Sequence, residues 1–166
     1  MSVKIIAAAF IAISALTMTP AVAQDAMATF FTGKSTATAN FSAINGVRRD
    51  FTVKLNGRNT GKTLILREDF VYADGERARK TWKFKKIGEG RYSGTREDVI
   101  GATTVRINGN TAKFTYLVDL DEGPGKNIVR FFDTIKFSID GKSALNTAIV
   151  TKYGLPVAKV RVEFER

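Results

Sequence analysis

One acidic side chain is predicted to lie within an apolar row. Strand alternation between residues 64 and 72 places Glu68 on one face with two leucines and two aromatic residues, namely Leu64, Leu66, Phe70 and Tyr72. An unpaired ionised carboxylate is costly to bury, so Glu68 needs a cationic or hydroxyl partner or a raised pKa. Arg79 is the predicted partner. Such a group serves as a polar anchor for a ligand or as a general base, and the alternative is a structural ion pair.

The composition restricts the chemistry further. Histidine and cysteine are both absent, which excludes imidazole acid–base catalysis, thiol nucleophiles and the common zinc sites. The sequence also lacks a Gly-x-Ser-x-Gly nucleophile elbow. An enzyme would therefore use carboxylates, tyrosine, lysine or serine, and we predict neither a metal nor a cofactor.

Five dipeptides predict the turns of the elements that position these residues. They are Asn45-Gly46, Asn56-Gly57, Asp74-Gly75, Asn108-Gly109 and Asp140-Gly141. Two-residue hairpin turns need positive φ at both central residues, which Asn, Asp and Gly accept most readily. Their repetition predicts an antiparallel sheet that folds back many times.

Alternating apolar and polar residues predict the strands between these turns. The expected strands are 51–55, 62–72, 82–85, 92–99, 103–107, 111–120, 128–137, 144–152 and 157–165. No segment has a helical apolar stripe of helical length. We predict an all-β fold, an antiparallel up-and-down, lipocalin-like barrel of about 8–10 strands, because closure removes the sheet edges. A two-sheet sandwich is the alternative. A barrel can enclose a small ligand, whereas a sandwich has a filled core.

The N-terminal residues predict export. Residues 1–23 combine Lys4, an apolar run and a small-residue site at residues 21–23, which is typical of a secretory signal peptide cleaved before Gln24. Residues 24–166 are then expected to form a single domain in the periplasm or outside the cell. Because the chain has no cysteine, it is not expected to be a lipoprotein.

The charge is strongly basic but dispersed. Lysine and arginine outnumber the acids by 26 to 16, for a net charge of +10. This favours a solvated basic exterior, and the alternative is attraction to an anionic membrane surface. No nucleic-acid-binding motif is present, so no nucleic-acid partner is predicted.

A set of residues in order along the chain resembles one family. The matched positions are Phe70-x-Tyr72-x-Asp74-Gly75-Glu76, Arg79, Trp82, Gly94, Asp98-Val99-x-Gly101, Gly109-Asn110, Tyr116 and Lys152-Tyr153-Gly154. They are similar to an uncharacterised family of bacterial envelope proteins known only as a domain of unknown function. The resemblance covers most of residues 24–166. Its members include lipoproteins, and its association with lipid-modification genes implies lipid handling.

Two departures from the family concern its chemistry. The lipoprotein cysteine is missing, so acylation does not carry over. Where the family tends to have two consecutive acids, this chain has Phe132-Asp133 and keeps only the second acid. If the acidic pair performs chemistry, this chain lacks part of it.

These observations predict a binding protein for a hydrophobic or amphipathic, lipid-like small molecule. The candidate ligand-binding residues are Glu68, Tyr72, Arg79, Trp82, Asp98, Tyr116 and Asp133. The competing classes are a carboxylate-based envelope enzyme acting on a lipid and a structural envelope protein with a filled core.

Overall fold

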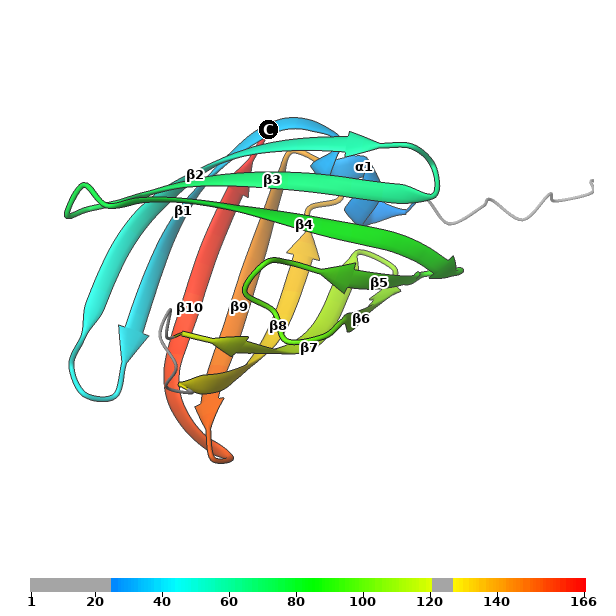
Figure 1. Ribbon diagram of the computed structural model, residues 1–166. Helices are drawn as coiled ribbons and strands as arrows, with labels where there is room; N and C mark the ends of the chain where they lie inside the picture. Colours follow the sequence, from blue (N-terminus) through cyan, green and yellow to red (C-terminus); the bar gives the residue numbers. More distant parts are fainter. Residues whose placement is uncertain (1–24, 121–126) are drawn as a thin grey trace, which may run out of the picture.

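The computed structural model describes residues 25–120 and 127–166, so the predicted signal peptide lies outside the described residues. The described part of the chain forms one short helix and ten strands (Figure 1). Their bounds are α1 Ala26–Phe31, β1 Gly33–Ala43, β2 Arg48–Asn59, β3 Thr63–Tyr72, β4 Arg77–Gly88, β5 Arg91–Thr95, β6 Thr103–Asn108, β7 Thr111–Asp119, β8 Ile128–Phe137, β9 Ser143–Lys152 and β10 Leu155–Glu165. No helix among these residues is long and apolar enough to cross a membrane.

The strands close into a barrel. Each strand pairs antiparallel with the next strand along the chain, and β1 also pairs with β10. In this closing pair Ala39 lies opposite Val162. Closure satisfies the backbone groups that an open sheet would leave at its edges. The predicted antiparallel barrel is therefore confirmed, and the sandwich alternative is wrong.

Three of the five predicted turn dipeptides lie between strands, Asn108-Gly109 begins at the last residue of β6, and Asn56-Gly57 is the exception. The predicted backbone conformation of these turns is wrong, because positive φ occurs at their glycines and not at the preceding Asn or Asp. For example, the Gly75 N–H donates to the Tyr72 carbonyl over 2.9 Å, and Gly75 itself has a φ of 88°. This is a turn followed by a left-handed glycine, which also reverses a hairpin.

The dipeptide Asn56-Gly57 lies inside β2, so the turn predicted there is wrong. A Cβ built on Gly57 would lie 1.6 Å from the carbonyl oxygen of Phe31, the last residue of α1. Glycine is needed here because two backbones approach closely, which is a common reason for glycine inside a strand. The strand continues to Asn59, and residues 60–62 connect it to β3.

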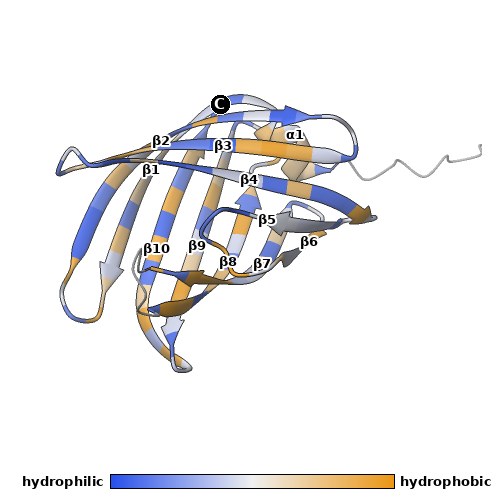
Figure 2. Ribbon diagram, viewed as in Figure 1, coloured by the Kyte–Doolittle hydropathy of each residue, from blue (hydrophilic) through white to orange (hydrophobic). Residues whose placement is uncertain are grey.

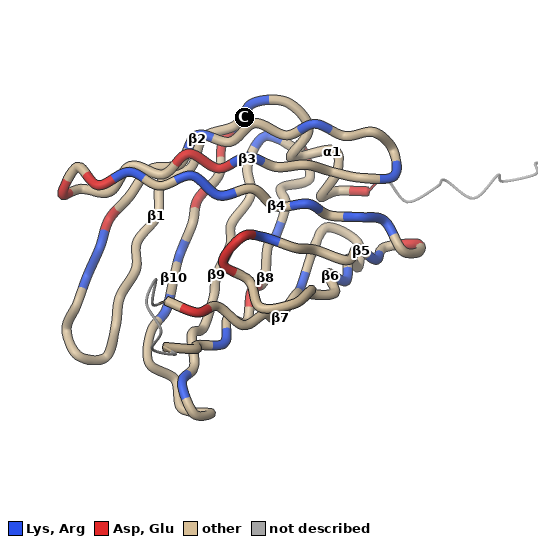
Figure 3. The backbone as a smooth tube through the Cα atoms, viewed as in Figure 1, with Lys and Arg blue, Asp and Glu red and all other residues tan. Residues whose placement is uncertain are grey.

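The barrel alternates apolar and polar residues along its strands (Figure 2). In β4, for example, Trp82 and Phe84 are buried whereas Lys83 and Lys85 are exposed. Lysine and arginine are distributed over many strands and are not gathered on one of them (Figure 3). Burial is thus directed into the barrel, and the basic charge is spread over its surface.

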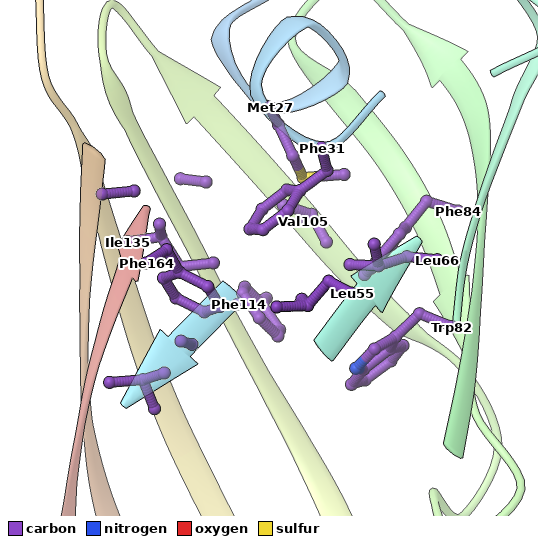
Figure 4. Packing of buried hydrophobic residues seen from close by; sticks show 14 of the residues in the cluster. Met27, Phe31, Leu55, Leu66, Trp82, Phe84, Val105, Phe114, Ile135 and Phe164 are labelled. Carbon is purple, nitrogen blue, oxygen red and sulfur yellow. The ribbon is translucent and has the colours of Figure 1, made fainter. Parts of the chain in front are cut away.

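The helix α1 closes one end of the barrel (Figure 1). Its first turn is capped by Asp25, whose Oδ1 accepts a 3.1 Å hydrogen bond from the Ala28 N–H. Met27 and Phe31 point from the helix into the barrel (Figure 4). The Phe31 ring packs edge-on against Phe164, with 5.4 Å between the centroids. The helix is therefore a plug that buries its apolar side chains in the end of the barrel.

Candidate functional site

The barrel encloses a cavity of about 720 Å³. At one end the cavity is lined by Met27 and Phe31 of α1, and at the other it reaches Ile44 and Lys152 beside the turns that follow β1 and β9. Most of the lining is apolar. The interior is therefore not the filled core that the structural-protein alternative predicted.

Aromatic rings form a continuous part of the cavity wall. Trp82 stacks on Phe84 of the same strand with 5.0 Å between the ring centroids. The Tyr116 ring meets Trp82 edge-on at 5.3 Å and stacks on Phe131 at 5.2 Å. Rings held in this way offer a rigid apolar surface, and the Tyr hydroxyl adds a polar group to it.

Glu68 faces the cavity, as the alternation of β3 predicts. Its side chain is 13% exposed, and Oε2 lies 3.6 Å from Nη1 of Arg96, a distance for an ion pair but too long for a hydrogen bond. Burial raises the pKa of Glu68 to about 7, although the charges of Arg96 and Lys80 oppose this shift. Near neutral pH this carboxyl group can therefore both accept and release a proton.

Arg96 connects Glu68 to a second carboxylate. It follows β5 directly, and its Nε donates to Oδ1 of Asp98 over 2.6 Å. Its guanidinium carbon lies 4.7 Å from the ring centroid of Trp82, which is a cation–π distance. Lys80 also binds Asp98. Burial acts against ionised Asp98, but the two cations prevail and hold the pKa of Asp98 below its usual value.

A second polar group lies on the opposite wall of the barrel. Asp133 of β8 is 5% exposed, and its Oδ1 accepts a 2.6 Å hydrogen bond from Nδ2 of Asn146 on β9. Burial raises the pKa of Asp133 to about 6, while interactions with Asn146 and the Tyr116 hydroxyl limit the shift. Burial also raises the pKa of Tyr116 well above its usual value, so this hydroxyl stays protonated.

Three buried acceptor atoms in the described residues have no hydrogen-bond partner. They are Oε2 of Glu68, Oδ2 of Asp133 and Oδ1 of Asn146, and all three residues line the cavity. Buried polar atoms in proteins are nearly always hydrogen-bonded. The cavity thus contains hydrogen-bond acceptors that have no donor, and they belong to these three residues.

Tyr72 lies at the end of β3 that is farther from α1. The guanidinium carbon of Arg49 sits 4.0 Å from its ring centroid, and the same guanidinium binds Glu76 over 2.6 Å and Asp74 over 3.0 Å. Tyr72 and Arg49 both line the cavity. These contacts hold an aromatic ring and a cation in place near the open end.

Six of the seven candidate residues predicted from the sequence line the cavity. These six are Glu68, Tyr72, Trp82, Asp98, Tyr116 and Asp133. The predicted pairing of Glu68 with Arg79 is wrong. Arg79 has a side chain that is 65% exposed, and its Nε donates to Oδ1 of Asp69 over 2.5 Å. Arg79 lies opposite Asp69 in the β3–β4 register, and both point outward.

Sequence reasoning missed Lys80, Arg96 and Asn146. The turn at Asp74-Gly75 carries a signal for Lys80, because a hairpin centred there places residue 80 opposite Glu68. The predicted strand 92–99 is wrong beyond Thr95, because β5 ends there, so Arg96 lies in the connection between β5 and β6 and strand alternation does not set its direction. Asn146 faces inward beside a carboxylate on the next strand, and only the register of β8 and β9 brings the two together.

The position at which the resembling family tends to have its first acid lies on the outer wall of the barrel. Phe132 occupies that position and is 44% exposed, whereas Asp133 beside it is buried in the cavity. The chain therefore keeps the inward-facing acid, and the departure leaves the interior set of carboxyl groups intact. No cluster of acidic side chains suited to a metal ion occurs among the residues that the structure describes.

Comparison with known proteins identifies the family. The chain belongs to the family described as a protein of unknown function (DUF3833), which matches residues 9–166. No curated protein matches the sequence.

Two solved structures share the barrel architecture. The S-type phycobiliprotein lyase CPES from Guillardia theta is 10% identical, with 84% of this chain and 90% of that chain covered and a TM-score of 0.60. Rv2717c from M. tuberculosis is 13% identical, with 82% and 92% covered and a TM-score of 0.55. At these identities the likeness concerns the fold.

Proposed function

We propose that this protein binds a hydrophobic or amphipathic, lipid-like small molecule inside its barrel. The observation that carries the proposal is the mostly apolar cavity of about 720 Å³, which α1 closes at one end. Pockets for small ligands usually have volumes of roughly 300–1,000 Å³ and combine an apolar lining with a few polar groups. The polar residues Glu68 and Asp133 supply such groups.

Acid–base chemistry on the same ligand is a second candidate function. It is favoured by the two buried carboxyl groups, since burial brings the pKa of Glu68 to about 7 and that of Asp133 to about 6. Groups with pKa values near the working pH are the most effective general acids and bases. Chemical alteration of a bound ligand would distinguish an enzyme from a carrier.

We further propose that binding takes place after export, in the periplasm or outside the cell. The support for this is the signal-peptide pattern of residues 1–23, together with the absence of cysteine for acylation. The exported chain is then expected to begin at Gln24 without an acyl group, which its intact mass would reveal. A full-length chain in the cytoplasm would reject the proposed location.

A fluorescent fatty-acyl probe tests the binding function. The probe is expected to bind saturably and to change the emission of Trp82, the single tryptophan, which lines the cavity. Replacing Ala148, a buried cavity residue of β9, by phenylalanine should fill part of the cavity and weaken binding by about tenfold or more, equivalent to roughly 1.4 kcal/mol.

The neighbouring substitution Thr147→Phe is the matched control. Thr147 is exposed on the same strand, so it adds the same ring outside the barrel and should leave binding unchanged. Circular dichroism would confirm that both variants are folded. Equal binding by the two variants, or non-saturable binding by the wild type, would place the probe elsewhere and contradict the proposed function.

A further inference from the structure

The unpartnered acceptors of the cavity belong to strands on opposite sides of the barrel. Ten strands form the ring, and β3 and β8 are five positions apart in it, so Glu68 and Asp133 line the interior from opposite sides. Asn146 lies beside Asp133 on β9. Glu68 and Asp133 are close enough for the charge of one to influence the other.

The donors near these acceptor atoms, which include the Tyr116 hydroxyl beside Asp133, make no hydrogen bond to them. Arg96 and Lys80 both bind Asp98, and Arg96 approaches Glu68 only at ion-pair distance. The Nδ2 donor of Asn146 is directed to Asp133. Oε2 of Glu68, Oδ2 of Asp133 and Oδ1 of Asn146 therefore accept no hydrogen bond from the described residues and are available to donors of a bound molecule.

We propose that the bound molecule carries a hydrogen-bond-donating head group, an ammonium or a hydroxyl, which sits between Glu68 on one wall and Asp133 with Asn146 on the other. This inference rests on the proposed function and specifies its ligand. A carboxylate head group fits the site poorly, because it would meet the two buried carboxyl groups of Glu68 and Asp133 and would bring no donor to their unpartnered oxygens.

The apolar part of the molecule has a defined place. Between α1 and the polar residues Glu68 and Asp133, the cavity is lined by apolar side chains, among them Met27, Phe31, Leu66 and Phe84. A hydrocarbon chain is favoured in this part of the barrel because its burial removes apolar surface from water. The site thus selects an amphiphile whose hydrocarbon chain fits the apolar end beside α1 and whose donor reaches Glu68 and Asp133.

Four amphiphiles of equal chain length test the inference in competition with the fluorescent probe. They are dodecylamine, dodecanol, dodecanoic acid and its methyl ester. The amine, the alcohol or both should bind about tenfold more tightly than the acid and the ester, the factor that one hydrogen bond to a charged group supplies. The ratio of amine to alcohol identifies which donor is preferred.

Two variants connect this preference to the named side chains. Asp133→Asn turns Oδ2 into a donor and should reduce the preference of the amine or alcohol over the ester by about tenfold. Glu68→Gln is the second variant and should act in the same direction. Glu165→Gln, on the exposed face of β10, is the control and should change nothing.

The outcomes separate the inference from the function on which it rests. Preference for the acid, or equal affinity for all four amphiphiles, would overturn the donor inference and leave small-molecule binding in place. An unchanged preference in both cavity variants would overturn it as well. If none of the amphiphiles displaced the probe and the probe itself did not saturate, both the inference and the proposed function would be wrong.

Discussion

Replacing Gly57 by alanine is expected to lower the free energy of unfolding by about 3 kcal/mol or more, because the new methyl group has no space. Its Cβ would lie 1.6 Å from the Phe31 carbonyl oxygen and 2.8 Å from the carbonyl carbon. These are backbone atoms, so no side-chain rotation can relieve the contact. Either α1 or β2 must move, and urea unfolding would measure the cost.

Displacement of α1 should also change the shape of the cavity, since Met27 and Phe31 of this helix line it. Gly57→Ala should therefore weaken probe binding as well as stability. Gly88→Ala is the matched control, because its Cβ would meet only the flexible end of the Arg91 side chain, at 3.0 Å. We expect the control to change the stability by less than about 1 kcal/mol. Equal urea midpoints for the two variants would contradict the close approach of β2 to α1.

Glu68 is expected to make the protein less stable as the pH rises toward neutrality. Burial raises its pKa from the ordinary value of 4.5 to about 7, so the folded protein binds the proton more tightly than the unfolded chain does. The stabilisation from the bound proton is full below the unfolded pKa and is lost as the pH rises through the folded pKa. Across this window the loss is about 3 kcal/mol, at roughly 1.4 kcal/mol for each pKa unit.

Glu68→Gln should remove this loss, because glutamine resembles the protonated carboxyl group at every pH. Between about pH 4 and about pH 8, the unfolding free energy of the variant should shift by about 3 kcal/mol in its favour relative to the wild type. Asp133, whose pKa burial raises from 3.8 to about 6, gives both proteins a further loss in the same direction. Glu165→Gln should follow the wild-type curve. Parallel curves for wild type and Glu68→Gln would place Glu68 outside the buried site.

Most strands of the barrel could be predicted from local signals in the sequence. The strand β1, which closes the ring, and the helix α1, which closes one end, could not. Turn dipeptides and alternation identify the strands from β2 onward, because each has bulky inward residues such as Leu55, Leu66 or Trp82. The strand β1 was missed because its buried positions are occupied by small residues, Ser35, Ala37 and Ala39. The helix α1 has six residues, too few for a 3.6-residue period to be visible.

The site could be predicted wherever alternation alone sets the direction of a side chain. Glu68 was placed inward correctly for this reason, and so was the row that contains Tyr72. Its partner was wrong because Arg79 is one residue out of phase with the inward face of β4, and register decides which side chains meet. Arg96 comes from a connection, so only the folded barrel reveals its approach to Glu68.

Native mass spectrometry of the protein, purified from the compartment in which we propose that it acts, would detect a ligand inside the barrel directly. We expect one small amphiphile bound to each wild-type chain, its loss in Ala148→Phe, and its retention in Thr147→Phe. The bound molecule should contain an amine or a hydroxyl group. A ligand inside the barrel would be contradicted if the wild-type protein carried no small molecule and acquired none when the amphiphiles were added. Equal loading of both variants would contradict it as well.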